Sequence, residues 1–493
     1  MQRARVSGSV SPIIIVGSGF AGLAMAIRLK QAGIHDFILF EQAGRVGGTW
    51  RDNHYPGAAC DVESHLYSFS FEPNPRWTRS FAPQAEILDY LEACARKYGL
   101  LPHIRLNTEV RRATFDERAG VWRVETSDGG TTMARVVVSA CGGLNRPALP
   151  DIPGLGAFGG KTFHSARWDE HANLDGKTVA VIGTGASAIQ IVPALAPKVG
   201  RLHLFQRTPP WILPKQDRAI TPRERQWFAR VPLLQRVARL RQYWWHELFA
   251  LGFVAEPRVM KLAERLARMY LAKSVPDPVL REKLTPRYTM GCKRVLLSND
   301  YYPALLRSNV ELVTDPIEAI EAEGVRTSDG GFREVDTLIL ATGFQAAEAV
   351  APFEIRGRGG RDLNDAWRDG PEAYLGTTIA GFPNLFLIVG PNVGLGHSSM
   401  VFMIESQAAY VMSCIEAMRA RRWKFVDVRP EAQAEENRKL QARFPRTVWS
   451  TGCVSWYQTR SGKNTTLWPG FTFEYRLRTR RFDPAPYEVV PMA

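Results

Sequence analysis

The feature that most constrains this chain is a pattern that occurs twice: a short apolar run, a glycine-rich turn and a helical stretch. The first copy is SPIIIVGSGFAGLAMAIRLKQAG, residues 11–33, and the second is GKTVAVIGTGASAIQIVPALA, residues 176–196. Each copy is followed by another apolar run that enters a glycine turn, at 135–143 and at 336–344. The period is longer than the roughly 20 to 50 residues of a solenoid repeat. We therefore predict an α/β fold with two Rossmann-like dinucleotide-binding domains.

The first glycine turn has the spacing of a nucleotide-binding loop. Gly17, Gly19 and Gly22 fit G-x-G-x-x-G, in which the glycines turn the chain, admit a pyrophosphate and let helix approach strand. Glu41 ends the next apolar run, DFILFE. A carboxylate there would bind ribose hydroxyls, and the alternative is an ordinary surface glutamate. Because the adenosine ribose of FAD carries no 2′-phosphate, the acid predicts FAD at this site.

The second glycine turn differs at the position that contacts the ribose. Its spacing is the same, with alanine as the third small residue, but the following run, RLHLFQRTPPW, carries Arg207 in place of an acid. A guanidinium can bind a 2′-phosphate, which a carboxylate would repel. The second nucleotide is therefore predicted to be NADP(H). The residues expected to bind it are Gly183, Thr184, Gly185, Ser187, Ala188, Arg207 and Thr208.

The two copies also predict the domain organisation. Residues 1–145 and 346–493 are expected to form a discontinuous FAD-binding domain, to which the run NLFLIVGP at 384–391 returns. Residues 146–345 are expected to form the NADP-binding domain, with a helical insert at 217–285.

The insert carries an aromatic and aliphatic face among arginines. We expect this face to pack over the nucleotide domains, because apolar stripes at helical spacing are usually buried. The alternative is a basic amphipathic helix that lies on a membrane surface. The residues of this face are Trp227, Leu234, Trp244, Trp245 and Leu248.

Composition excludes several other classes of protein. The 493 residues carry a formal charge of +14 without a nucleic-acid-binding motif, so no nucleic-acid partner is predicted. The six cysteines form no C-x-x-C pair, which predicts neither a metal site nor a disulfide framework and suits a reducing compartment. No apolar run is long enough to span a bilayer, and no signal peptide is recognisable. We expect a cytoplasmic protein whose oligomeric state remains open.

A flavin and its reductant on two domains indicate an oxidoreductase. Disulfide reductases share this plan but need a paired redox cysteine motif near the flavin, which the sequence lacks. Oxygen is therefore the expected electron acceptor.

Between the two glycine repeats lies a segment that neither nucleotide loop requires. AFGGKTFHSARWDE, residues 157–170, places Phe158, Gly160, His164, Trp168 and Asp169 in the pattern F-x-G-x-x-x-H-x-x-x-W-D. This pattern resembles the fingerprint of type I Baeyer–Villiger monooxygenases, whereas the related flavin-containing monooxygenases usually lack its Trp-Asp ending. GGTWRDNHYPGAACD at 47–61 and DTLILATGF at 336–344 are also similar to motifs of the family. The fingerprint is expected to couple the domains and orient NADP, and an ordinary interdomain turn is the alternative.

The resemblance implies an enzyme that inserts one oxygen atom of O2 into a ketone C–C bond through a flavin C4a-peroxide, giving an ester or lactone. By the same resemblance, Arg294 in GCKRVLLSNDYY is the catalytic cation and also contacts NADP, and Lys293 joins Arg207 on the 2′-phosphate. Asp61 resembles the acid that pairs with this arginine, although DVES could also begin a helix with Asp61 as N-cap. The flavin contacts carried over by the match are Gly48, Thr49, Trp50, Asp61, Tyr67, Val110 and Met400.

The residues that bind the substrate are the least well predicted from the sequence. Trp456 and Trp468 fall where the family has a mobile loop, which makes them candidates to line the pocket of an apolar ketone. Two alternatives remain at this point: a flavin-containing monooxygenase that oxygenates nitrogen or sulfur, and an NADPH- and FAD-binding sensor without oxygenase activity.

Overall fold

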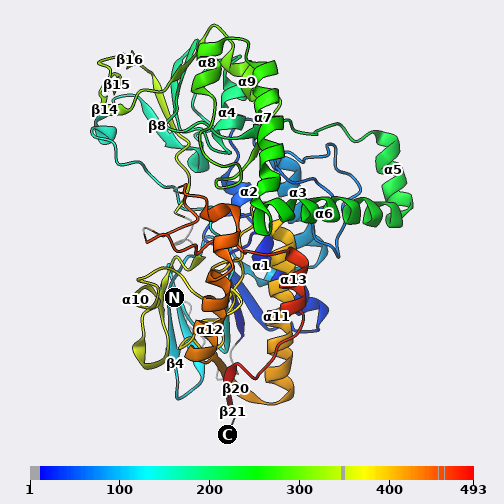
Figure 1. The fold of residues 1–493 in the computed structure, drawn as a ribbon. Coiled ribbons are helices and arrows are strands. Elements are labelled where there is room, and N and C mark those ends of the chain that lie inside the picture. Colours follow the sequence, from blue (N-terminus) through cyan, green and yellow to red (C-terminus); the bar gives the residue numbers. More distant parts are fainter. Residues whose placement is uncertain (1–11, 346–349, 454, 460, 493) are drawn as a thin grey trace.

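The computed structural model describes residues 12–345, 350–453, 455–459 and 461–492. Both predicted segments of the FAD-binding domain, 1–145 and 346–493, start with residues that the structure does not describe. Figure 1 shows two lobes, with the C-terminus at the bottom of the lower one.

The lower lobe is built on a parallel sheet with the strand order β19-β7-β1-β2-β3. Strands β1, β2, β7 and β19 are largely buried and almost wholly apolar, as in sheets covered on both faces, whereas the edge strand β3 is partly exposed. The strand at 385–387 pairs with β7 although about 250 residues separate them, so the sheet is discontinuous in sequence. The strands are β1 (Ile13–Val16), β2 (Phe37–Phe40), β3 (Ile104–Arg105), β7 (Val136–Ser139) and β19 (Leu385–Leu387).

The upper lobe repeats this arrangement with the order β13-β10-β9-β17-β8. All its strand pairs are parallel. The predicted fold class of two Rossmann-like domains is confirmed. The strands are β8 (Lys161–His164), β9 (Thr178–Ile182), β10 (Arg201–Phe205), β13 (Val310–Val313) and β17 (Thr337–Leu340).

Each glycine turn connects the central strand of its sheet to a helix. In the lower lobe β1 leads to α1 (Phe20–Gln31), which packs against α11 (Met400–Ala420). In the upper lobe β9 leads to α4 (Ala188–Leu195), which packs against α9 (Tyr301–Leu305). Both turns therefore lie at the carboxyl edge of a parallel sheet, where such folds bind nucleotides.

Small sheets and further helices complete the two lobes. The small sheets have the orders β18-β4-β5-β6, β14-β15-β16, β11-β12 and β20-β21. Their strands are β4 (Val110–Asp116), β5 (Val121–Thr126), β6 (Thr131–Ala134), β11 (Ile212–Leu213), β12 (Leu296–Leu297), β14 (Ile317–Glu321), β15 (Gly324–Thr327), β16 (Phe332–Glu334), β18 (Glu354–Arg356), β20 (Trp423–Val428) and β21 (Tyr487–Pro491). The other helices outside the insert are α2 (Thr49–Asp52), α3 (Gln84–Lys97), α10 (Leu363–Ala366), α12 (Pro430–Gln441) and α13 (Thr472–Arg478). Short 3-10 turns occupy Leu101–His103, Leu155–Ala157, Ser165–Arg167, Pro257–Val259, Arg358–Gly360, Phe444–Arg446 and Val448–Ser450.

The segment expected to be a helical insert contains four helices, two of which project from the side of the molecule (Figure 1). The expectation that its aromatic face packs over the nucleotide domains is wrong. Trp227, Trp244 and Trp245 are 59%, 54% and 54% exposed, and Leu234 and Leu248 are also exposed. No helix among the described residues is long and apolar enough to cross a membrane. The helices are α5 (Pro222–Arg230), α6 (Pro232–Val254), α7 (Met260–Ser274) and α8 (Pro278–Lys283).

The spacing of the cysteines suggests no disulfide framework, but the structure contains one disulfide bond. Cys292 and Cys453 are bonded, with their Cα atoms 6.2 Å apart, although 161 residues separate them in sequence. Spacing motifs detect pairs that are close along the chain, whereas this pair is brought together by the fold. The bond ties the segment before Lys293 and Arg294 to the C-terminal region. The free cysteines are Cys60, Cys94, Cys141 and Cys414.

Candidate active site

The first glycine loop is shaped to admit a phosphate group. Gly17 has φ +101°, and a Cβ atom on Gly22 would lie 1.8 Å from the Gly17 carbonyl oxygen, so neither position accepts a side chain. Gly19 is the N-cap of α1, and no side chain caps this helix end. The first backbone N–H groups of α1 therefore remain available for an anion. These features fit the pyrophosphate of FAD.

Glu41 is placed at the end of β2 beside this loop and is 4% exposed. Its carboxylate accepts hydrogen bonds from the Ser18 backbone N–H at 3.0 Å and hydroxyl at 2.6 Å, and from the Ala43 N–H at 2.9 Å. Arg51 forms an ion pair with it at 3.0 Å. A buried acid held in this way is fixed in position to contact ribose hydroxyls.

The segment expected to contact the flavin lies against the first glycine loop. A Cβ atom on Gly48 would lie 3.0 Å from the Gly19 Cα atom, and Gly48 is the N-cap of α2, which begins at Thr49. The Trp50 indole donates a hydrogen bond to the Tyr67 hydroxyl at 3.1 Å. Both rings are partly buried, and burial raises the pKa of Tyr67. Of the remaining candidates, Val110 is buried in β4 and Met400 begins α11.

The second glycine loop has the same features in the upper lobe. Gly183 has φ +111°, and a Cβ atom there would lie 2.4 Å from the Ala341 carbonyl oxygen. A Cβ atom on Gly185 would meet no atom within 4 Å, so this glycine borders open space. Ser187 precedes α4, which begins at Ala188, and makes no capping hydrogen bond. The helix end is therefore free to bind a second pyrophosphate.

The cations expected to bind the 2′-phosphate lie near one another. Arg207 is exposed just beyond β10, and the Thr184 hydroxyl donates to the Thr208 carbonyl oxygen at 2.9 Å. The Lys293 ammonium lies 5.0 Å from the centre of the Tyr288 ring. Burial and the positive charge of Arg207 lower the pKa of Lys293. Two neighbouring cations that repel each other could together hold a dianionic phosphate.

Asp61 and Arg294 form an ion pair. The Arg294 Nη2 and Nε atoms lie 2.6 and 2.8 Å from the Asp61 Oδ2 atom. Arg294 Nη1 also donates to the Leu395 carbonyl oxygen at 3.4 Å. The two side chains are 34% and 31% exposed, so a ligand can reach the guanidinium. No helix begins at Asp61, so the alternative that it caps a helix is wrong.

The segment that carries Asp61 lies at the contact between the lobes. The Tyr55 hydroxyl donates to the Gln190 side chain at 3.0 Å, and Gln190 Nε2 donates to the Ala59 carbonyl oxygen at 3.0 Å. Gln190 belongs to α4, the helix that follows the second glycine loop. These contacts place the segment before Asp61 against the helix that follows the second glycine loop.

The pair keeps both groups ionised. Burial raises the pKa of Asp61, but the charge of Arg294, its hydrogen bonds and the charge of Lys215 together outweigh burial, and the net effect is a lowered pKa. The negative charge of Asp61 raises the pKa of Arg294. The site therefore holds a permanent cation in a fixed orientation.

Two neighbours of this pair carry no recognisable sequence signal. The Lys215 ammonium donates to the Cys60 carbonyl oxygen at 3.1 Å, and burial lowers its pKa. Tyr457 is 2% exposed near Arg294, and burial raises the pKa of its hydroxyl to about 12. Both reach the site from segments more than 150 residues away from Asp61, so spacing could not reveal them.

The fingerprint builds an edge of the upper sheet. Phe158 packs against the core of that lobe, and a Cβ atom on Gly160 would lie 2.4 Å from the Asp336 carbonyl oxygen. His164 ends β8 and is 4% exposed. Its Nδ1 atom accepts a hydrogen bond from the Ala166 N–H at 3.1 Å, and its Nε2 atom is unpaired among the described residues. Burial lowers the pKa of His164.

The Trp-Asp ending of the fingerprint follows this histidine. Trp168 packs on Phe163, and Asp169 pairs with Lys161 at 3.2 Å.

The two tryptophans expected to line the pocket have different environments. Trp456 is 53% exposed, with its ring 4.6 Å from that of Tyr457. Trp468 is 1% exposed and packs on Tyr475 in a hydrophobic core cluster. The Trp468 indole N–H donates to the Phe471 carbonyl oxygen at 3.0 Å.

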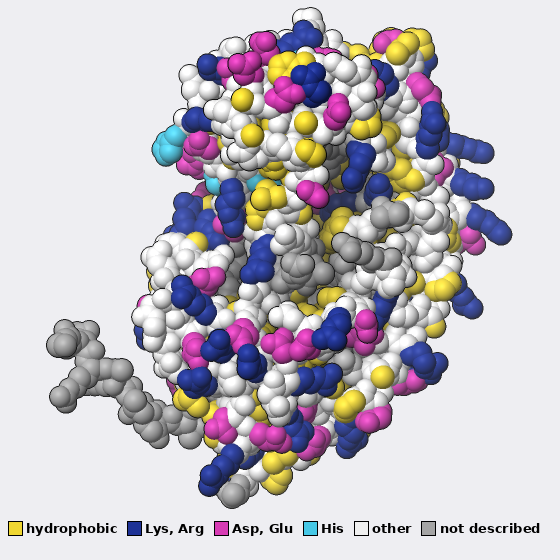
Figure 2. Space-filling model, turned by 90° about the vertical axis from the view of Figure 1, so that its left-hand side faces the viewer, with side chains coloured by type: hydrophobic (Ala, Val, Ile, Leu, Met, Phe, Trp, Pro, Cys, Tyr) yellow, Lys and Arg dark blue, Asp and Glu magenta, His cyan; other side chains and the backbone are white. Residues whose placement is uncertain are grey.

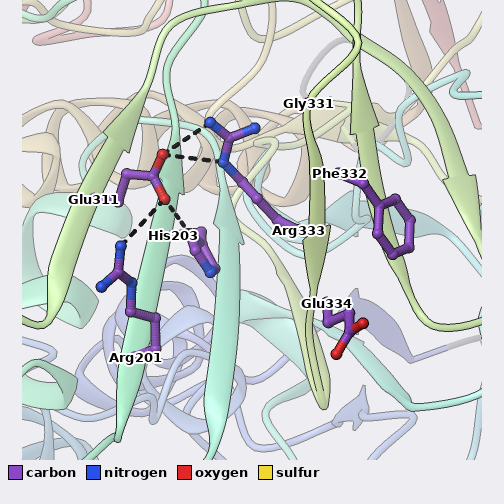
Figure 3. Close-up of a pocket in the computed structure, with 7 residues that line it drawn as sticks. All are labelled: Arg201, His203, Glu311, Gly331, Phe332, Arg333 and Glu334. Atoms are coloured by element: carbon purple, nitrogen blue, oxygen red, sulfur yellow. Dashed lines mark hydrogen bonds and ion pairs between the residues drawn. The ribbon is translucent and has the colours of Figure 1, made fainter.

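Charged side chains that line a separate pocket at the far end of the upper sheet pair with one another (Figure 3). Glu311 accepts from Arg333 and is paired with His203, each at 2.8 Å. Arg201 begins β10, so this pocket lies toward the amino end of the strands, opposite the glycine loop. It is separate from the site of the chemistry. Its lining residues are Arg201, His203, Glu311, Gly331, Phe332, Arg333 and Glu334.

Comparison with known proteins identifies relatives along nearly the whole chain. The chain is 52% identical over 479 residues to a Baeyer–Villiger monooxygenase from Pseudomonas aeruginosa, covering 97% of this chain and 91% of that protein. It is 48% identical to a Baeyer–Villiger monooxygenase from Streptomyces coelicolor, covering 97% and 92%. A family model described as pyridine nucleotide-disulphide oxidoreductase matches residues 14–237.

Solved structures give the same result. Cyclohexanone monooxygenase from Rhodococcus sp. Phi1 bound to NADP+ superposes with a TM-score of 0.88 at 31% identity, covering 99% of this chain and 100% of that chain. The OTEMO complex with FAD and NADP superposes with a TM-score of 0.89 at 28% identity, covering 98% and 100%.

Two nucleotide-binding lobes and an accessible, ionised arginine fit the class of flavoprotein monooxygenases, to which the superposed structures belong. Within this class, the chain belongs to the Baeyer–Villiger monooxygenases. It is an FAD- and NADPH-dependent enzyme of that family, and the predicted family, enzyme class and cofactors are confirmed.

Proposed function

We propose that this protein converts an apolar ketone into an ester or lactone at a site centred on Arg294 and Asp61. The observation that carries this proposal is the ion pair between them, which is one-third exposed and lies where the two nucleotide-binding lobes meet. Bound FAD and NADPH would supply the hydride transfer and the reduced flavin that delivers one atom of O2 to the substrate.

Arg294 would stabilise negative charge as it develops on oxygen beside the flavin. A fixed cation acts most strongly in a site from which water is largely excluded, because it needs no reorganisation during the reaction. Asp61 would hold the guanidinium in place through its contacts at 2.6 and 2.8 Å. Its own ionisation would keep the pair electrically balanced before substrate binds.

Each nucleotide would be held by residues of its own lobe. Ser18 and Glu41, with the N-terminus of α1, would bind the FAD phosphates and ribose. Arg207, Thr208 and Lys293 would bind the 2′-phosphate that distinguishes NADPH from NADH. The fingerprint, which lies between the lobes along the chain, would couple them and orient NADP.

The domain division supported by the sheets is 1–145 with 346–493 for FAD and 146–345 for NADP. The return of β19 to the lower sheet supports the discontinuous FAD domain. We place the enzyme in the cytoplasm, where NADPH is regenerated.

The experiment that tests the proposal incubates the FAD-loaded enzyme with NADPH, air and linear, cyclic, aromatic and steroid ketones, and measures esters or lactones against NADPH consumed. Ester formation matched to NADPH consumption is the expected result. Hydrogen peroxide as the sole product with every ketone would refute it. Oxygenation of amines or sulfides without any ester would instead assign the enzyme to nitrogen or sulfur oxygenation.

A further inference from the structure

Helix α6 buries apolar residues, among them Tyr243, Ala250 and Phe253, but it also carries an apolar stripe on its exposed side. Its inward face makes polar contacts with the lower lobe: Gln235 donates to the Asn74 carbonyl oxygen at 2.6 Å, and Arg239 donates to those of His65 and Ser68 at 2.7 and 2.8 Å. Gln235 and Glu247, both on this face, are each 3% exposed. Surface helices normally bury an apolar stripe and expose polar residues.

The outward face of α6 carries an apolar stripe, here called the α6 face. Its members follow one another at spacings of three or four residues, which places them on one side of the helix. They are between 40% and 65% exposed and extend for roughly 27 Å at 1.5 Å per residue. The α6 face consists of Leu233, Val237, Leu240, Trp244, Leu248 and Leu251.

Further apolar residues widen this surface. Trp245 and Phe249 lie beside the stripe and are 54% and 47% exposed. Across it, Phe473 of α13 lies 6.2 Å from Trp244 between ring centres and is also exposed. Exposed apolar side chains that gather in this way normally mark a site that contacts an apolar partner.

Basic side chains flank the α6 face on both sides. By helical rotation Arg236 lies to one side of the stripe and Arg241 to the other, and both are exposed. Neither forms an ion pair with a described carboxylate. The surrounding segment, 221–274, contains eleven Lys or Arg against four Asp or Glu. This segment therefore supplies half of the +14 charge of the chain.

We infer that the α6 face docks on the surface of an anionic lipid membrane, with the helix lying in the plane of the interface. Its Leu and Trp side chains would enter the boundary between headgroups and acyl chains, and the flanking arginines would contact lipid phosphates. Tryptophan is suited to this depth because its ring is apolar and its N–H is polar.

The positive charges beside the α6 face favour a membrane, rather than a second copy of this chain, as its partner. A symmetric dimer through the α6 face would place the flanking arginines of one copy near those of the other, and like charges repel. An anionic membrane instead neutralises them. The polar inward contacts remain unchanged on docking, so the lobes need not rearrange.

The test measures flotation of FAD-loaded enzyme with phosphatidylcholine vesicles, with and without phosphatidylglycerol. We expect binding to the vesicles that contain phosphatidylglycerol and much weaker binding to pure phosphatidylcholine. The Arg236→Gln/Arg241→Gln variant should bind about 25-fold more weakly, at about fivefold for each charge near an anionic surface. The Leu240→Gln/Trp244→Gln/Leu248→Gln variant should bind about 100-fold more weakly.

Matched controls replace exposed residues of the same types outside the insert. Arg105→Gln/Lys198→Gln and Leu101→Gln/Leu149→Gln should bind vesicles like the parent protein. The FAD content of each variant shows that it folds. No binding of the parent protein to any vesicle, or equal weakening by the control variants, would overturn the proposal. A dimer that the α6 face variants convert to a monomer, without vesicle binding by the parent, would assign this surface to a second copy and would also overturn it.

Discussion

Replacing Arg294 with alanine should separate cofactor chemistry from oxygen transfer to the ketone. The substitution removes the cation and both contacts to the Asp61 Oδ2 atom, at 2.6 and 2.8 Å. Loss of one group that stabilises developing negative charge costs about 2.7–4 kcal/mol, or roughly 100- to 1,000-fold in rate. The glycine loops and Glu41 are untouched, so FAD should remain bound.

The assay follows three quantities separately: FAD content, the rate of anaerobic reduction by NADPH in a stopped-flow instrument, and ester formed in air. In Arg294→Ala we expect NADPH oxidation to continue with hydrogen peroxide as the product while ester formation falls by at least about 100-fold. Arg294→Lys keeps the positive charge but not the planar guanidinium group, and its ester formation should fall by about tenfold. Ester formation within tenfold of the parent enzyme in Arg294→Ala would refute the role given to this residue.

Three further predictions concern neighbouring features. Arg207→Ala should raise the KM for NADPH by roughly 10- to 100-fold and leave that for NADH unchanged, because it removes charged hydrogen bonds to the 2′-phosphate; an equal change for both nucleotides in steady-state kinetics would contradict this. The pKa of Asp61 is lower in the folded protein than its value of about 3.9 in the unfolded chain, so the ionised carboxylate stabilises the fold above that pH. This contribution is lost as the pH falls through the folded pKa. The free energies of unfolding of Asp61→Asn and the parent, measured in urea, should therefore approach each other below about pH 4. Cys453→Ser should lower the free energy of unfolding by about 2–4 kcal/mol, and a reductant should destabilise the parent but not this variant.

The two nucleotide folds were predictable because their signals are local. An apolar run, a glycine turn and a helical stretch lie within about 20 residues, and the backbone geometry at Gly17 and Gly183 requires glycine. The choice between FAD and NADP likewise depends on one residue at the end of the next strand. Interactions between residues that are close along the chain can be predicted from the sequence.

Features that depend on contacts between distant segments were not predictable in the same way. The Cys292–Cys453 bond and the approach of Lys215 to the site join segments more than 150 residues apart. Arg294 was located through family resemblance, since an isolated Lys-Arg pair carries no signal of its own. Helix α6 has apolar residues on both its buried and its exposed sides, and part of its inward contact is made by hydrogen bonds of Gln235 and Arg239. Its periodicity alone therefore does not tell which face meets the lobe.

The most direct test of the central claim follows the oxygen atom itself. FAD-loaded enzyme, NADPH and a ketone that it converts would be incubated under 18O2, and the product would be analysed by mass spectrometry. The account predicts an ester or lactone that contains one atom of 18O, inserted between the carbonyl carbon and the migrating carbon. Product without 18O, or NADPH oxidation that yields only labelled hydrogen peroxide, would contradict it.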